Sequence, residues 1–216
     1  MAKIMTDFYL IRHGQTAWNR DRVFRGRIDV PLDDTGRREA EAVAQWLADV
    51  ELNHIYSSPL SRAAETATIL ARNRGITVRK LEGLQDIEYG KWQGLPEIDV
   101  RRSYPALIRE WETSPHQVTF PEGESLASVR ARSLDCIHQL TLHHPGETLA
   151  LVSHRVVLKV LCLALLGLPD SQFWHIQQDT CCINRFRMDG RSATVLLLND
   201  TCHLKGLQRD TAGVDF

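Results

Sequence analysis

Two histidines in the sequence each follow a short apolar run and each have an arginine beside them. His13 stands between Arg12 and Gly14, directly after the run at residues 8–11, and His154 is followed by Arg155. A neighbouring cation disfavours the imidazolium form, which leaves a neutral imidazole that can act as a nucleophile. Arginine holds phosphate through paired N–H groups, and Gly14 lets the backbone approach a ligand closely. This combination predicts phosphate chemistry at His13.

Arg62 is a further cation whose position needs a reason. It is expected in the first turn of a helix after Ser57, Ser58 and Pro59. Positive charge there opposes the helix dipole. Arg62 is therefore either a solvated surface residue or part of an anion site that it forms together with the helix amino terminus.

Phosphoryl transfer from an ester also needs a proton for the leaving group and later a base for water. Asp86 and Glu88 lie in the segment that leads away from the predicted third strand. In an extended segment, two residues apart, both carboxylates would point the same way. Either could serve, and spacing alone does not choose between them.

Strands that alternate with helices are expected to position these groups. We predict strands at residues 8–11, 54–56, 77–81 and 148–153, with a hairpin of residues 182–187 and 194–198. We predict one helix that Asp34 or Thr35 caps and further helices over residues 61–72, 125–138 and 156–166. This order is typical of an α/β fold with a mostly parallel sheet. Ligands of such sheets bind at the carboxyl ends of the strands, where both histidines would lie.

The length of 216 residues suits one domain, which we place at residues 1–207. Residues 84–121 are broken by glycine and proline and are read as a long excursion with one or two helices, the second near residues 104–112. Its part at 93–121 would form a small cap over the site. Residues 208–216 carry no pattern and are read as a disordered tail.

Composition excludes several classes of protein. The formal net charge is −1, which argues against a nucleic-acid partner. The longest apolar stretch, residues 149–168, contains His154, Arg155 and Lys159, so no membrane span is expected. Five cysteines form an odd set without a CxxC motif, and no signal peptide is visible, so we expect a cytoplasmic protein with reduced thiols.

No metal ligand motif such as HxH or HExxH occurs, and neither a metal nor another cofactor is expected. The adjacent pair His143 and His144 ends a predicted helix and is read as surface. The sequence leaves the oligomeric state open, with a dimer among the options.

Several segments in the correct order resemble the histidine phosphatase superfamily, whose members are similar to phosphoglycerate mutase. They are LIRHGQTAWN at residues 10–19, FRGRIDVPL at 24–32, YSSPLSRAAETA at 56–67, the segment 84–94, PEGES at 121–125, LVSH at 151–154 and NDTCHL at 199–204. The resemblance implies a three-layer α/β/α sandwich and a phosphohistidine formed on His13 without a metal.

The resemblance also implies roles for other residues. Arg12, Arg62 and a protonated His154 would hold the phosphate oxygens, and Asn19, Arg25 and Gly26 would assist. The family's acid/base glutamate corresponds to Asp86 here. The implied activity is hydrolysis of a small phosphomonoester. The alternative is a cofactor-dependent phosphoglycerate-type mutase, although those mutases are usually longer than this chain.

Three positions depart from the family pattern. Asp86 is one methylene shorter than the usual glutamate, Gln93 replaces a second glutamate, and Arg155 replaces a common glycine. Arg155 would place additional positive charge beside the pocket. We therefore expect it to bind substrate and to favour esters that carry a second anionic group.

Overall fold

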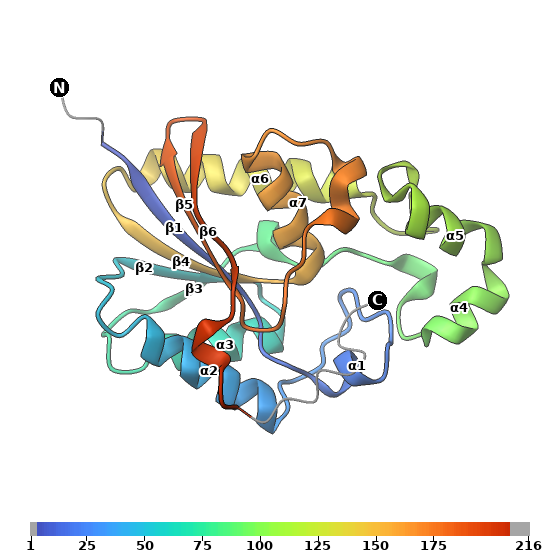
Figure 1. Cartoon of the computed structure of the whole chain (residues 1–216), viewed down its shortest axis with the longest axis horizontal. Coiled ribbons are helices and arrows are strands. Elements are labelled where there is room, and N and C mark those ends of the chain that lie inside the picture. Colours follow the sequence, from blue (N-terminus) through green and yellow to red (C-terminus); the bar gives the residue numbers. More distant parts are fainter. Residues whose placement is uncertain (1–3, 208–216) are drawn as a thin grey trace.

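The structure, a computed structural model, describes residues 4–207 and is built on one six-stranded sheet (Figure 1). The strands are β1 (Thr6–Arg12), β2 (His54–Ser57), β3 (Val78–Lys80), β4 (Thr148–Ser153), β5 (Ile183–Asp189) and β6 (Ser192–Asp200). They are ordered β3-β2-β4-β1-β5-β6. The first four in this order are parallel, and β5 and β6 add an antiparallel hairpin at one edge. The predicted α/β fold with a mostly parallel sheet is confirmed.

Four long helices cover the two faces of this sheet. Helices α2 (Asp34–Trp46) and α3 (Ser61–Ala71) lie on one face, and α6 (Leu126–His143) and α7 (Arg155–Leu165) lie on the other (Figure 1). The implied three-layer α/β/α sandwich is therefore present. Residues 208–216, predicted as a tail, lie outside the described residues.

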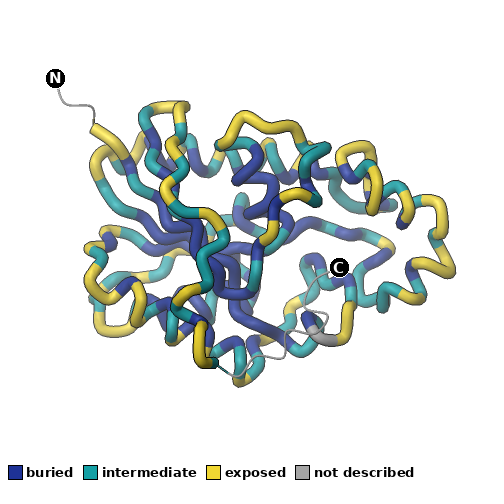
Figure 2. Tube along the Cα trace, in the orientation of Figure 1, coloured by how far each residue is buried: buried dark blue, intermediate teal, exposed yellow. Residues whose placement is uncertain are grey.

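Alternation along β1 explains why there are two apolar layers. Phe8 and Leu10 face α6 and α7, whereas Tyr9 and Ile11 face α2 and α3, because successive strand residues point to opposite faces. The central strands are buried on both sides, as Figure 2 shows in dark blue. This burial fixes the strand ends, and with them the residues that follow β1 and β4.

Several predicted boundaries are corrected by the structure. Asp33, not Asp34 or Thr35, caps α2, because its carboxylate accepts the Gly36 N–H at 2.8 Å. The loop after β1 contains a short helix, α1 (Ala17–Arg20), and the third strand is shorter than predicted. Within the described residues, no helix is long and apolar enough to cross a membrane.

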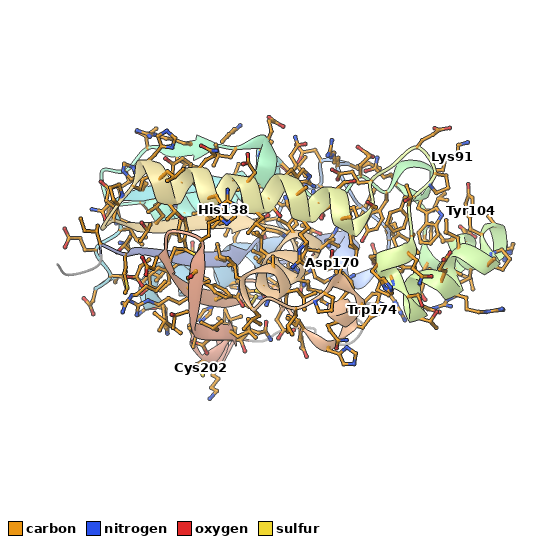
Figure 3. The ribbon with its side chains drawn as sticks, turned by 90° about the horizontal axis from the view of Figure 1, so that it is seen from above. Lys91, Tyr104, His138, Asp170, Trp174 and Cys202 are labelled. Atoms are coloured by element: carbon orange, nitrogen blue, oxygen red, sulfur yellow. The ribbon has the colours of Figure 1, made fainter. Side chains whose placement is uncertain are left out.

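The excursion after β3 forms a helical extension at one end of the molecule. It contains α4 (Glu97–Ser103) and α5 (Pro105–Thr113), and Lys91, Tyr104 and Trp174 gather at this end in Figure 3. Trp174, from the segment after α7, donates its indole N–H to the Trp111 carbonyl at 2.9 Å. The extension is therefore attached to the body of the fold beside the carboxyl ends of the strands.

Candidate active site

The two predicted histidines meet where β1 and β4 end. These strands are parallel neighbours, with Arg12 in register with Ser153, so His13 and His154 leave the sheet side by side. Their ring centroids are 5.1 Å apart, and both side chains are buried. Parallel pairing therefore brings together two residues that are 141 positions apart in the sequence.

The hydrogen bonding of His13 leaves one ring nitrogen available. Nδ1 lies 2.7 Å from the Gly14 carbonyl oxygen, which can only accept, so Nδ1 carries the proton. Nε2 is buried and has no hydrogen-bond partner among the described residues. Burial lowers the pKa of His13 well below 6.5, and the charges of Arg62, Arg25 and Arg12 lower it further. At neutral pH the imidazole is therefore uncharged, and its Nε2 carries an unshared lone pair.

Close backbone packing holds the loop that carries His13. A Cβ atom on Gly14 would lie 2.3 Å from the Gly36 carbonyl oxygen, so no larger residue fits there. The Gly14 N–H also donates to the Thr66 hydroxyl at 3.2 Å. Helices α2 and α3 thereby fix the position of the His13 backbone.

Two buried arginines stand in the same region. Arg62 donates to the Gly26 and Ile28 carbonyl oxygens at 2.8 and 3.0 Å, and its Nη2 also lies 3.1 Å from Asp86 Oδ2. Arg12 donates to the Gln178 carbonyl at 2.6 Å. Of the two readings of Arg62 that the sequence left open, the solvated surface residue is therefore wrong.

His154 is oriented by Ser58 from the turn after β2. Ser58 Oγ lies 2.8 Å from His154 Nε2 and itself accepts the Leu60 N–H at 3.3 Å. Ser58 can donate its hydroxyl proton to Nε2, and in that tautomer the His154 proton lies on Nδ1, 3.6 Å from Asp86 Oδ2. Burial and the Arg62 charge lower the pKa of His154 well below 6.5. In the ligand-free protein this lowered pKa favours the neutral ring, and the protonated His154 expected in the phosphate complex stays a prediction.

The structure separates the two candidate carboxylates. Asp86 Oδ2 faces Arg62 and His154, whereas Glu88 lies 3.6 Å from Arg27 and is partly exposed. Arg132 and Glu124 brace this segment: Arg132 donates to the Asp86 carbonyl at 3.1 Å, and Glu124 accepts the Glu88 N–H at 3.0 Å. The shorter side chain of Asp86 reaches the site because this bracing sets the path of the backbone.

The predicted substrate-binding residues line one cavity beside Asp86. Asn19, Arg25, Gly26 and Arg155 all border it. Arg25 donates to the Thr16 hydroxyl at 2.7 Å, and Asn19 Oδ1 accepts the Thr16 N–H at 2.9 Å. The Asn19 amide nitrogen is buried, with no partner among the described residues. It is therefore a donor available to a ligand.

Gln93, the second departure from the family pattern, also has a structural role. Its Oε1 accepts the Arg27 N–H at 2.6 Å and lies where a Cβ on Gly26 would stand. Gly26 has a φ of +52°, a conformation that glycine adopts without strain. An amide oxygen at residue 93 is thus sufficient to hold the loop that carries Arg25 and Gly26.

Tyr89 borders the same cavity and was not found by sequence reasoning. Burial raises the pKa of Tyr89 to about 12, and the nearby Arg155 charge and hydrogen bond oppose this rise. The phenol therefore stays protonated beside Arg155. Ser58, Thr16 and Gln178 were also missed as supporting residues; they became visible only when the loops were placed in three dimensions.

Comparison with known proteins agrees with this geometry. Residues 8–201 match the model of the histidine phosphatase superfamily (branch 1). Phosphoserine phosphatase 1 of Hydrogenobacter thermophilus is 36% identical over 93% of this chain and 95% of its own length. A probable phosphoglycerate mutase of Yersinia pestis is 30% identical, with 84% of each chain covered.

A solved structure shares the fold along almost its whole length. The mycobacterial glucosyl-3-phosphoglycerate phosphatase, in a complex with VO3, has a TM-score of 0.84 and 27% identity, with 93% of this chain and all of that chain covered. Sequence, fold and the arrangement around His13 agree. The chain belongs to branch 1 of the histidine phosphatase superfamily and is a hydrolase of the phosphatase type.

Proposed function

We propose that this protein hydrolyses a small phosphomonoester through a phosphohistidine on His13. The observation that carries the proposal is the Nε2 atom of His13, which is buried, unprotonated and without a partner among the described residues. Arg62, Arg25 and Arg12 are close enough to lower its pKa. A nucleophile surrounded by fixed cations suits attack on a phosphate dianion.

In the first step, His13 Nε2 forms a bond to phosphorus while the bond from phosphorus to the ester oxygen breaks. Arg12, Arg62 and the Nδ1–H of His154 hold the non-bridging oxygens, where charge must be stabilised. Asp86 acts as the general acid of this step. Its proton passes to the departing alkoxide.

The second step returns the enzyme to its starting state. Asp86, now a carboxylate, removes a proton from water while the water oxygen attacks phosphorus and the N–P bond breaks. Inorganic phosphate leaves, His13 is neutral again and Asp86 is protonated. No step requires a metal or another cofactor.

Arg155 supports a more specific proposal about the substrate. It borders the cavity beside Asp86, and it hydrogen-bonds Tyr89. An arginine binds a carboxylate well through paired N–H groups. We therefore place the second anionic group of the substrate on Arg155, as in phosphoserine, the substrate in the name of one relative.

The mutase alternative is supported by the names of relatives, among them the probable phosphoglycerate mutase of Yersinia pestis and a phosphoglycerate mutase-like protein of Arabidopsis thaliana. Its test is the formation of 2-phosphoglycerate from 3-phosphoglycerate, which a phosphatase does not produce.

We also propose a cytoplasmic location, for which the sequence offers the unpatterned cysteines as support.

Phosphate release in excess EDTA tests the proposed function. Wild type and His13→Ala would be compared on phosphoserine, phosphoethanolamine, 3-phosphoglycerate and p-nitrophenyl phosphate. We expect hydrolysis that persists in EDTA, vanishes in the variant and is faster for phosphoserine than for phosphoethanolamine, which lacks the carboxylate. Activity that EDTA abolishes, or that His13→Ala retains, would contradict the proposal.

A further inference from the structure

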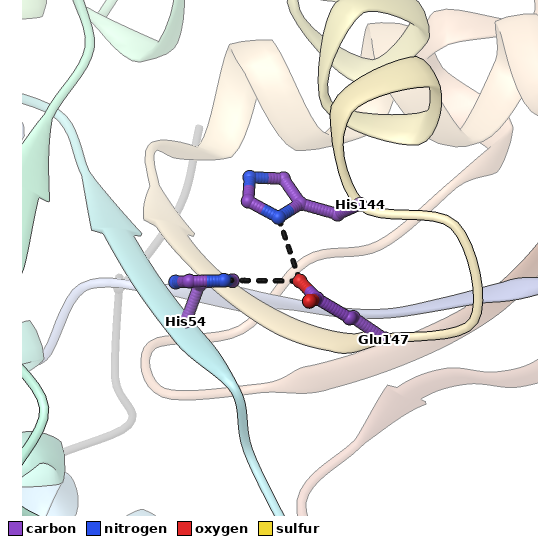
Figure 4. Close-up of side chains that lie close together, drawn as sticks. All are labelled: His54, His144 and Glu147. Atoms are coloured by element: carbon purple, nitrogen blue, oxygen red, sulfur yellow. Dashed lines mark hydrogen bonds and ion pairs between the residues drawn. The ribbon is translucent and has the colours of Figure 1, made fainter.

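Two histidines and a glutamate form a cluster at the amino ends of the parallel strands, whereas His13 lies at their carboxyl ends. His54 begins β2, His144 follows the end of α6, and Glu147 directly precedes β4 (Figure 4). Glu147 and His154 flank β4 at its two ends, which places them about 23 Å apart at 3.3 Å per residue. The cluster is therefore separate from the proposed phosphate site.

The three side chains converge on a single atom. Glu147 Oε2 lies 3.0 Å from His54 Nε2 and 2.7 Å from His144 Nδ1. One nitrogen from each ring and a carboxylate oxygen all lie within 4.8 Å of one another. Among the described residues, only these two imidazoles form ion pairs with the Glu147 carboxylate. No lysine or arginine from that part of the chain competes for it.

The backbone around the cluster is fixed before any ligand binds. The His144 carbonyl accepts the Thr6 hydroxyl at 2.8 Å, and the Glu147 carbonyl accepts the Asp7 N–H at 3.0 Å. Asn53, which precedes His54, accepts the Thr148 N–H on its side-chain oxygen at 2.7 Å. The ends of two strands and a helix thus hold the side chains on rigid elements, as a preorganised site requires.

His144 also has the outer partner that metal-binding histidines usually show. Its Nε2 lies 2.8 Å from the Tyr56 hydroxyl, which Arg79 contacts at 3.4 Å. A ring nitrogen that is hydrogen-bonded on the far side fixes the orientation of the ring and leaves the other nitrogen for the ion. The His144 side chain is only 12% exposed, so the surface placement read from the sequence is wrong for His144, whereas it is right for the exposed His143.

We propose that His54 Nε2, His144 Nδ1 and a Glu147 oxygen bind one divalent transition-metal ion, with Zn²⁺ as the best fit. Two imidazoles and one carboxylate are a donor set that Zn²⁺ accepts, with water as the fourth ligand. Bonds of 2.0–2.1 Å in a tetrahedron separate the ligand atoms by about 3.3 Å. The two N–O distances of 3.0 and 2.7 Å need to widen by about 0.3 and 0.6 Å, and the two ring nitrogens, which lie within 4.8 Å of each other, must also settle near 3.3 Å. Each imidazole carries its proton on the outward nitrogen when the metal is bound.

The ion would join the start of β2, the end of α6 and the start of β4. The bound ion stabilises the fold. It takes no part in phosphoryl transfer, because the proposed phosphate site lies at the carboxyl ends of the strands and the metal site lies at their amino ends. The expectation of no metal site rested on local spacing. His54 lies 90 residues before His144 in the sequence, and only the pairing of β2 with β4 brings them together.

Zinc titration of the full-length protein tests this proposal. The protein is first stripped with a chelator, and Cys202→Ser serves as background because the thiol of Cys202 is exposed and a thiolate is itself a zinc ligand. Zn²⁺ is titrated by calorimetry into this protein and into Glu147→Gln, His54→Gln and His143→Gln variants. His143 is the matched control, since it is exposed, neighbours His144 and hydrogen-bonds the Gln139 carbonyl rather than Glu147.

We expect one equivalent of Zn²⁺ to bind and raise Tm in the background protein and in His143→Gln. Glu147→Gln and His54→Gln should each weaken binding at least 100-fold and remove the rise in Tm. Co²⁺ should give the visible absorption of a four-coordinate site only where Zn²⁺ binds. Stoichiometric binding that survives in both variants, or no binding to the background protein, would overturn the proposal. The phosphate-release assay in EDTA does not depend on the outcome of the zinc titration. Failure of the metal-site proposal can therefore be distinguished from failure of the proposed phosphatase function.

Discussion

Replacing Asp86 with asparagine removes the proposed proton donor while keeping the shape of the side chain. Asp86 Oδ1 accepts the Ile87 N–H at 3.0 Å, and Oδ2 faces Arg62 at 3.1 Å. Asparagine can keep the first contact through its oxygen. Arg62 retains its bonds to the Gly26 and Ile28 carbonyls, so its position does not depend on Asp86 alone. The variant is therefore expected to fold and to bind phosphate.

The size of the effect follows from the leaving group. General acid catalysis contributes about 10²–10⁴ in rate, equivalent to about 2.7–5.5 kcal/mol of activation free energy. A serine-type alkoxide needs that proton, so kcat on phosphoserine should fall by this factor. p-Nitrophenolate leaves without a proton, so kcat for formation of the phosphoenzyme from p-nitrophenyl phosphate should fall less than about tenfold.

The assay is single-turnover formation of phosphoenzyme with each ester, in Asp86→Asn and in Glu88→Gln. Glu88 is the matched control, because it lies two residues away in the same segment but faces Arg27. Glu88→Gln should change neither rate more than about threefold. An equal loss on the alkyl and aryl esters in Asp86→Asn would refute the acid role. A loss confined to Glu88→Gln would assign that role to the other carboxylate.

Three further predictions concern the residues around His13. Arg155→Gly should raise KM for phosphoserine about tenfold or more and leave KM for phosphoethanolamine unchanged, as steady-state kinetics will show; an unchanged preference would exclude Arg155 as the second anion site. Gly14→Ala should destabilise the fold by about 1–3 kcal/mol in urea unfolding, because its Cβ would overlap the Gly36 carbonyl; full stability would contradict the close approach. The free energy of unfolding should fall as pH drops below 6.5, because the pKa values of His13 and His154 are lowered in the folded protein and the unfolded chain binds protons that the folded protein does not. Each of the two histidines contributes up to about 1.4 kcal/mol per pH unit to this fall. Urea unfolding at pH 7.5 and 5.5 should show a smaller fall in His154→Gln than in wild type; identical falls would refute a neutral buried His154.

The strand ends and the residues that follow them could be predicted because both depend on residues that are neighbours in the sequence. An apolar run followed by Arg12, His13 and Gly14 predicts a buried strand that opens into a ligand loop, and β1 ends as expected. The adjacency of His13 and His154 followed from a general rule of parallel sheets. Neither inference needed side-chain coordinates.

Other features depend on contacts between distant segments and could not be predicted. Spacing alone could not choose between Asp86 and Glu88, and only the family resemblance pointed to Asp86; the physical difference comes from bracing by Arg132 and Glu124, in α6 and the turn before it. The charge state of His154 depends on burial and on Arg62, which no local pattern reports. The supporting bond from Ser58 likewise joins residues 96 positions apart.

The most direct test of the central claim is to trap the phosphoenzyme. Wild type and His13→Ala would be mixed with phosphoserine in excess EDTA, quenched in alkali within one turnover and analysed by mass spectrometry. We predict one added phosphoryl group, located on the peptide that contains His13, in wild type alone. Turnover without this adduct, or a phosphoryl group on any other residue, would contradict the phosphohistidine mechanism.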